Sequence, residues 1–154
     1  MKSLHVSIPD QELRLYQGDN LLSSYPVSTS KFGLGIEEGS NKTPLGNFRI
    51  CEKYGSRAPT GTIFKGRKPQ GVWQLGHQPD QDFVLTRIFR LESLEPKLAN
   101  TYQRYIYFHG TNQEDLIGSP ASHGCIRLKN TEIIDLFSQV PVGTPVHISN
   151  HSFS

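Results

Sequence analysis

Ser122-His123-Gly124-Cys125-Ile126-Arg127-Leu128 is the most informative stretch of this chain, and Ile106-Tyr107-Phe108-His109-Gly110-Thr111 precedes it closely. A cysteine attacks only as its thiolate, and a free thiol has a pKa of about 8.5. A neighbouring imidazole must therefore accept the proton if the cysteine is to act near neutral pH. The pattern predicts that Cys125 is a nucleophile and that His109 is its base.

The residues around the two motifs support a site at the end of a strand. His109 follows the apolar run 105–108 and is followed by Gly110, so we expect it where a rigid strand gives way to a loop. Turn-forming residues before Ser122 allow the chain to return toward His109. Gly124 lets the backbone approach a substrate closely, and its N–H together with that of Cys125 is expected to form an oxyanion hole.

Other interpretations of these residues stay open at this point. A lone cysteine is usually a small buried hydrophobe, and a lone histidine is usually a satisfied core or surface group. His109, His123 and Cys125 are also compatible with a zinc site that has one open position, for which His77 would have to be recruited. The combination of both motifs favours catalysis by a cysteine, and no metal is predicted.

Composition and patterning indicate one mainly β domain. The chain has 154 residues, and its 14 glycines and 10 prolines separate short apolar runs throughout. Alternation with period two predicts an antiparallel meander over residues 4–27. Further strands are expected at 47–50, 61–64, 83–89, 105–109 and 145–149. The glycine-containing segment 30–46 is expected to be a long loop and a candidate lid.

A single helix is expected near the C-terminus, over residues 131–139. Asn130 is placed to cap its N-terminus, and Pro141 follows its end. Its apolar residues recur at helical spacing and are expected to cover the sheet: Ile133, Leu136, Phe137 and Val140.

Charge and cysteine content exclude several classes of protein. The net charge of +2 is too small to indicate a nucleic-acid partner. Residues 49–68 carry six cations and one acid, which predicts either a solvated loop or a surface that attracts an anionic substrate. Two cysteines are too few for a disulfide framework, so both are expected to be free thiols, with Cys51 buried and structural.

Targeting signals are not evident in the sequence. The first ten residues lack the apolar run of a secretory signal, and no segment has the length of apolar residues that spans a membrane. The expected location is the cytoplasm, or the periplasm only if a signal has been removed.

Both motifs resemble those of the YkuD-type L,D-transpeptidase catalytic domains, which read His-Gly-Thr, a loop and then Ser-His-Gly-Cys-Ile/Val-Arg. The segment 42–48, KTPLGNF, is similar to that family's Thr-Pro-x-Gly-x-Phe segment. The resemblance covers nearly the whole chain. It implies a mainly β, sandwich-like or barrel-like fold with one or two short helices, as a single catalytic domain over residues 1–150 followed by a tail, 151–154.

The resemblance also implies a reaction on peptidoglycan-derived stem tetrapeptides or muropeptides, without a cofactor. Cys125 would attack the carbonyl between the third residue, commonly meso-diaminopimelate, and the terminal D-Ala. His109 would take the thiol proton, the carbonyl of Gly110 would orient the imidazole, and His123 would support the pocket. Arg127 and Ser122 are the implied substrate-binding residues.

The role implied for Arg127 is to hold a substrate carboxylate with two parallel hydrogen bonds. A structural salt bridge is the alternative role for its guanidinium.

The fate of the thioester decides which enzyme this is. The runs 85–88 and 104–107 resemble short members that act as L,D-carboxypeptidases in murein recycling, so hydrolysis is favoured. One alternative is an L,D-transpeptidase that forms 3-3 cross-links or exchanges D-amino acids. An alternative of another class is a non-catalytic domain that binds muropeptides or polyanions.

Overall fold

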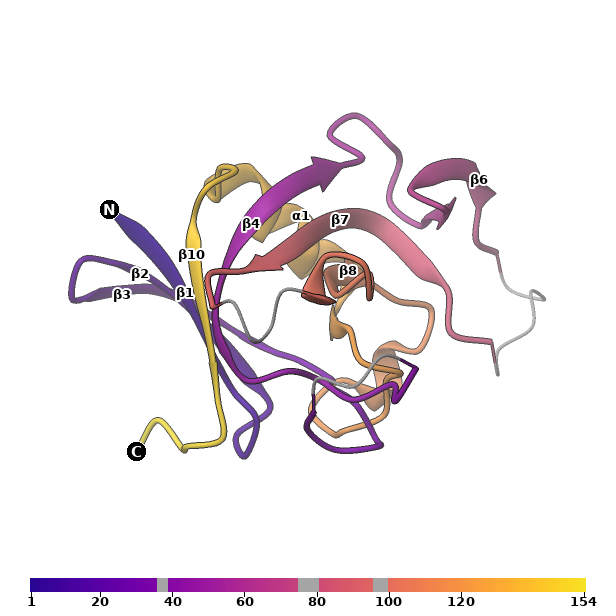
Figure 1. Ribbon diagram of the computed structural model, residues 1–154. Helices are drawn as coiled ribbons and strands as arrows, with labels where there is room; N and C mark the ends of the chain where they lie inside the picture. Colours follow the sequence, from indigo (N-terminus) through magenta and orange to yellow (C-terminus); the bar gives the residue numbers. More distant parts are fainter. Residues whose placement is uncertain (36–38, 75–80, 96–99) are drawn as a thin grey trace.

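A computed structural model describes residues 1–35, 39–74, 81–95 and 100–154 (Figure 1). It has the expected mainly β architecture with one α-helix among the described residues. The strands are β1 (Lys2–Ser7), β2 (Glu12–Gln17), β3 (Asn20–Pro26), β4 (Gly46–Tyr54), β5 (Thr62–Lys65), β6 (Lys68–Val72), β7 (Val84–Ser93), β8 (Tyr107–Gly110), β9 (Ile126–Leu128) and β10 (Pro145–Ser149). The helix is α1 (Asn130–Gln139), and Glu114–Leu116 forms a short 3-10 turn.

The strands form one branched sheet in the order β3-β2-β1-β10-β4-β7-β5-β6. The first three strands are the predicted meander, and β10 pairs parallel to β1, so the first and last strands lie side by side and the chain begins and finishes at opposite ends of this pair. The branch occurs at β7, which also pairs with β8, and β8 pairs parallel to β9. In Figure 1 the β5–β6 hairpin lies at the end of the molecule opposite the two termini.

The core lies between the curved sheet and α1, which packs on β7 and β8. Alternate residues of the strands point into it, as Leu4 and Val6 of β1 and Leu13 and Leu15 of β2 do. The predicted apolar face of α1 is confirmed, with three of its four residues buried and Phe137 packed at the edge of the core.

The helix begins one residue earlier than predicted, so the expected cap at Asn130 is wrong. Lys129 occupies the cap position without a side-chain hydrogen bond, and the N–H of Asn130 donates to the Glu114 carboxylate at 2.7 Å. The Asn130 side chain instead donates to the carbonyl of Thr111 at 2.8 Å. This amide therefore ties the start of the helix to the chain that follows β8.

Two strands were not expected from the sequence, and one is shifted. β6 contains Pro69 and Gly71, and both residue types are depleted in strands. The two residues are tolerated here because β6 is an edge strand that is exposed along its whole length. β9 has only three residues, too few for alternation to be visible. The strand expected from Tyr105 begins at Tyr107, because Tyr105 has a left-handed φ of 56° that cannot continue a strand.

The six cations of the basic stretch 49–68 lie in two places in the fold. Arg49 forms an ion pair with Glu92, and Lys53 donates to two carbonyls at the C-terminal end of α1, at 2.7 and 2.8 Å. The remaining four lie on and around the β5–β6 hairpin. The two cysteines are free, as expected; Cys51 is only partly buried, and burial raises the pKa of its thiol to about 11.

Candidate active site

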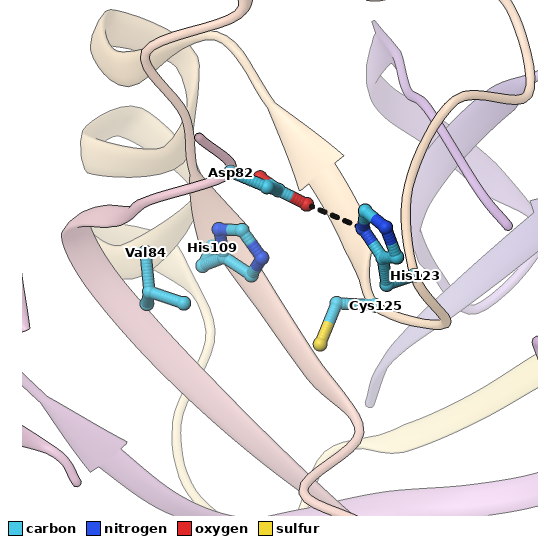
Figure 2. A pocket seen from close by; sticks show the side chains of 5 residues that line it. All are labelled: Asp82, Val84, His109, His123 and Cys125. Atoms are coloured by element: carbon cyan, nitrogen blue, oxygen red, sulfur yellow. Dashed lines mark hydrogen bonds and ion pairs between the residues drawn. The ribbon is translucent and has the colours of Figure 1, made fainter. Parts of the chain in front are cut away.

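His109, His123 and Cys125 face one cavity of about 400 Å³, which Asp82 and Val84 also line (Figure 2). The parallel pairing of β8 and β9 explains why the two motifs meet. Its register places His109 opposite Arg127, so Cys125, which directly precedes β9, reaches the position beside β8. The sheet thus holds the predicted nucleophile and base from both motifs at one place.

The His109 imidazole is buried and has a defined tautomer. Its Nδ1 lies within hydrogen-bond distance of the Gly110 carbonyl, as expected. Because a carbonyl can only accept, Nδ1 carries the proton and Nε2 keeps its lone pair. Burial lowers the pKa of His109, although Asp82 and the Gly110 carbonyl act in the opposite direction. The ring is therefore a neutral imidazole at pH 7, which can accept a proton.

The Cys125 thiol is a neutral group in this arrangement. Its Sγ donates to the carbonyl of Tyr105 at 3.4 Å, and burial raises the pKa of the thiol to about 12. A backbone hydrogen bond from Tyr107 favours the thiolate but does not outweigh burial. Cys125 and His109 are thus a neutral thiol and a neutral imidazole, so an attack by this sulfur requires that the thiol loses its proton in the same step.

Asp82 is a site residue that the sequence did not indicate. Its carboxylate accepts from Arg127 Nη1 at 3.0 Å and lies 3.4 Å from His123 Nδ1, the contact drawn in Figure 2. The His123 side chain is half exposed, so Asp82 links a residue at the mouth of the cavity to one beneath it. No spacing relates Asp82 to the two motifs, and it comes next to the cavity because it lies two residues before the start of β7, which pairs with β8.

The expectation that Arg127 holds a substrate carboxylate is not met. Its side chain is fully buried, and its guanidinium also donates to Gln113 Oε1 at 2.6 Å and to Ser28 Oγ at 3.1 Å. A substrate carboxylate would have to displace Asp82 in the interior of the protein. The structure thus favours the alternative role, a structural ion pair.

Ser122 is likewise a structural residue rather than one that reaches substrate. It is buried, and its hydroxyl donates to the carbonyl of Cys125 at 2.6 Å and accepts from Gly124 N–H at 3.3 Å. The N–H of Gly124 is therefore already used, and the expected pair of oxyanion donors is not preformed.

Gly124 is required by its surroundings. Its φ is 120°, and a Cβ there would lie 3.3 Å from the carbonyl oxygen of Lys42. Thr43 Oγ1 donates to the Gly124 carbonyl at 3.0 Å, and Lys31 N–H donates to the carbonyl of Ser122. The described parts of the candidate lid, residues 30–35 and 39–46, are therefore bonded to the loop that carries Cys125.

The zinc alternative gains no support from the described residues. Within 1–35, 39–74, 81–95 and 100–154, no three His, Cys, Asp or Glu side chains are arranged to hold a metal ion. His77, which that interpretation would recruit, lies outside these ranges. In the same ranges, no helix has the length and apolar character needed to cross a membrane.

Comparison with known proteins gives a consistent result. The chain matches the YkuD family, the L,D-transpeptidase catalytic domain, over residues 1–148. It is 28% identical over 144 residues to the putative L,D-transpeptidase YkuD of Bacillus licheniformis, an alignment that covers 94% of this chain and 63% of that protein. The chain thus spans somewhat less than two thirds of the length of this relative.

Solved structures show the same fold. The catalytic domain of the Enterococcus faecium L,D-transpeptidase superposes with a TM-score of 0.61 at 16% identity and covers 97% of both chains. L,D-transpeptidase 3 of Mycobacterium tuberculosis, solved with a faropenem-derived adduct, also gives a TM-score of 0.61 at 16% identity, over 96% of this chain and 60% of that one.

Proposed function

Because this chain belongs to the YkuD family of L,D-transpeptidase catalytic domains, we propose that it is a cysteine peptidase that removes the terminal D-Ala from peptidoglycan stem tetrapeptides. The observation that carries the proposal is the position of Cys125 in one cavity with a neutral His109, whose Nε2 lone pair is free. These two groups are what acyl transfer through a thioester requires.

The reaction can be followed atom by atom. His109 Nε2 takes the thiol proton as Sγ of Cys125 attacks the carbonyl carbon that precedes D-Ala. Collapse of the tetrahedral intermediate breaks the C–N bond, and the imidazolium returns its proton to the leaving amine, which releases D-Ala and leaves a thioester. A water molecule then gives one proton to His109 and attacks the thioester, so that the tripeptide leaves with a new carboxylate and the thiol is restored.

Two segments support hydrolysis as the second step. The run 85–88 forms the bulged part of β7 opposite His109 and Gly110, and the run 104–107 supplies the carbonyl that accepts from the Cys125 thiol. These are the segments that resemble L,D-carboxypeptidases of murein recycling, and both adjoin the reacting groups. The proposal places the enzyme in the cytoplasm, where released stem peptides are trimmed, and cell fractionation with an antibody to the protein tests that part.

The decisive experiment is incubation of the protein with disaccharide-tetrapeptide, with and without a D-amino acid or a second stem as acceptor. Mass spectrometry of the products should show tripeptide and free D-Ala even when the acceptor is present. Cys125→Ser should abolish the reaction, whereas Cys51→Ser should leave it unchanged. D-amino acid exchange or a cross-linked dimer would instead establish a transpeptidase, and binding of the muropeptide without any product would establish a binding domain.

A second readout tests the nucleophile without a natural substrate. Since a relative of the same fold was solved with a faropenem-derived adduct, we expect faropenem to acylate this protein once, at Cys125. Intact-mass spectrometry should show one adduct on the wild type and on Cys51→Ser, and none on Cys125→Ser. An adduct on Cys51 instead would contradict the assignment.

A further inference from the structure

The burial of Arg127 leaves the anionic end of a stem peptide without an assigned partner, and the surface next to Cys125 offers one. We propose that Arg67, held by Tyr105 and Tyr107, forms a subsite that binds a carboxylate of the substrate. The inference rests on the proposed function, because it names the group by which that site selects its peptide.

Arg67 is held in place by two aromatic residues. It lies in the turn between β5 and β6 with a left-handed φ of 67°. Its Nη1 donates to the Tyr107 hydroxyl at 3.1 Å, and its guanidinium carbon lies 5.1 Å from the centre of the Tyr105 ring. A guanidinium fixed from two sides loses little conformational entropy when it binds a ligand. Arg67 is therefore preorganised rather than a freely moving surface cation.

The same two tyrosines border the nucleophile. The carbonyl of Tyr105 accepts from Cys125 Sγ at 3.4 Å, and the backbone of Tyr107 hydrogen-bonds to that sulfur. Tyr107 and His109 are alternate residues of β8, so their side chains leave the strand on the same face. The guanidinium of Arg67 is thus separated from the reacting sulfur by about one tyrosine side chain, with the cavity and His109 further along the strand.

Charge around this surface favours an anion. Among the described residues Arg67 forms no ion pair, whereas the neighbouring Arg90 is paired with Glu52 at 3.2 Å. Arg90 also lies 4.8 Å from the centre of the Tyr105 ring, and its pairing with Glu52 leaves Arg67 as the cation of this surface that has no acidic partner among the described residues. The half-exposed Tyr105 ring shields one face of the Arg67 guanidinium from water. A planar guanidinium with free donors matches a carboxylate, which it can bind with two parallel hydrogen bonds.

A stem tetrapeptide carries one carboxylate at its terminal D-Ala and others on the residues before it. The experiment has to distinguish whether Arg67 binds the terminal carboxylate or an internal one. Steady-state kinetics of Arg67→Met, Arg67→Lys and the control Lys68→Met distinguish them with three peptides. These are the tetrapeptide, its C-terminal amide and the same peptide amidated on its internal carboxylates. We expect Arg67→Met to raise KM about 10–100-fold with kcat within about threefold, Arg67→Lys to restore part of the loss, and Lys68→Met to behave as the wild type.

The matching amide identifies the carboxylate. The amide that removes the carboxylate bound by Arg67 should raise the KM of the wild type by the same factor as Arg67→Met does. The same amide should not raise the KM of Arg67→Met any further. Unchanged kinetics in Arg67→Met would overturn the subsite. The same conclusion would follow if each amide raised the KM of Arg67→Met by the same factor as it raises the KM of the wild type.

Binding separates this inference from the proposed reaction. Calorimetry with the tetrapeptide on Cys125→Ser, with and without Arg67→Met, measures the contact whether or not the wild type turns the peptide over. We expect Arg67→Met to raise Kd about 10–100-fold in this background. Equal affinity in the two variants, or no binding to Cys125→Ser at millimolar peptide, would overturn the proposal. Arg67-dependent binding without turnover would refute the peptidase and leave the subsite standing.

Discussion

Asp82→Asn should destabilise the fold as well as alter the cavity, because Asp82 is the carboxylate that compensates a fully buried guanidinium. The Arg127 side chain is 0% exposed and that of Asp82 is 17% exposed. Removing one partner of a buried ion pair costs about 3–5 kcal/mol, because the other charge stays buried. Asparagine keeps an oxygen that can accept from Nη1, and Gln113 and Ser28 still accept from the guanidinium. The expected loss in the free energy of unfolding is therefore smaller than this range, about 2–3 kcal/mol.

Urea denaturation followed by far-UV circular dichroism at pH 7 measures this loss directly. In a thermal scan it corresponds to a fall in Tm of about 4–12 °C for a chain of this length. Asp115→Asn, which changes an exposed carboxylate, is the matched control and should stay within about 0.5 kcal/mol of the wild type. Adding Arg127→Met to Asp82→Asn should cost less than the sum of the two single changes. A loss below about 1 kcal/mol in Asp82→Asn, or strict additivity in the double variant, would refute the ion pair as a structural element.

Three further outcomes are expected from the site. Gly110→Ala should lower the free energy of unfolding, measured in a urea titration, by about 3 kcal/mol and abolish turnover, because the added Cβ would lie 2.8 Å from the Leu85 carbonyl oxygen. A folded, active variant would contradict this. Since the pKa of His109 is lowered, kcat/KM should fall on the acid side only below pH 6.5, and a limb above that value would show a different base. In Cys51→Ser, iodoacetamide should alkylate Cys125 at pH 7 at least about 100-fold more slowly than it alkylates a free cysteine peptide, because the pKa of the Cys125 thiol is raised to about 12. Equal rates would indicate that Cys125 rests as a thiolate.

The regular parts of the fold follow from the sequence because their periodicity is local. Apolar residues alternate in β1 and β2, and a two-residue turn at Gly18 and Asp19 leads from β2 to β3, so strand and turn signals agree. The apolar stripe of α1 is equally direct. The proximity of Cys125 and His109 could also be predicted, because both motifs adjoin β8 and β9, whose pairing the intervening turn makes possible.

The use of each polar side chain could not be predicted, because it depends on partners far along the chain. Arg127 looks like a ligand-binding arginine in its motif, but its carboxylate partner lies 45 residues earlier at a position that no pattern marks. Ser122 is similar, since its hydroxyl is consumed by the turn that presents Cys125. Arg67 lies in a basic stretch that composition alone cannot divide, and only the fold separates it from Arg49, which is paired on β4.

The strand pattern also fails where the backbone departs from it, and these places adjoin the site. Thr86 is a buried, β-branched residue with a φ of 76°, in the bulge of β7 that faces Gly110 and His109. Such a conformation costs about 1–3 kcal/mol and persists only where other contacts hold it. Here Thr86 Oγ1 accepts from the N–H of Gly61 at 2.9 Å. Tyr105, also left-handed, turns its carbonyl toward the Cys125 thiol. Regular β7 and β8 strands would need neither conformation. Both breaks adjoin His109 and Cys125, so in the proposed reaction the irregular backbone is the cost of positioning the base and the thiol at the end of a sheet.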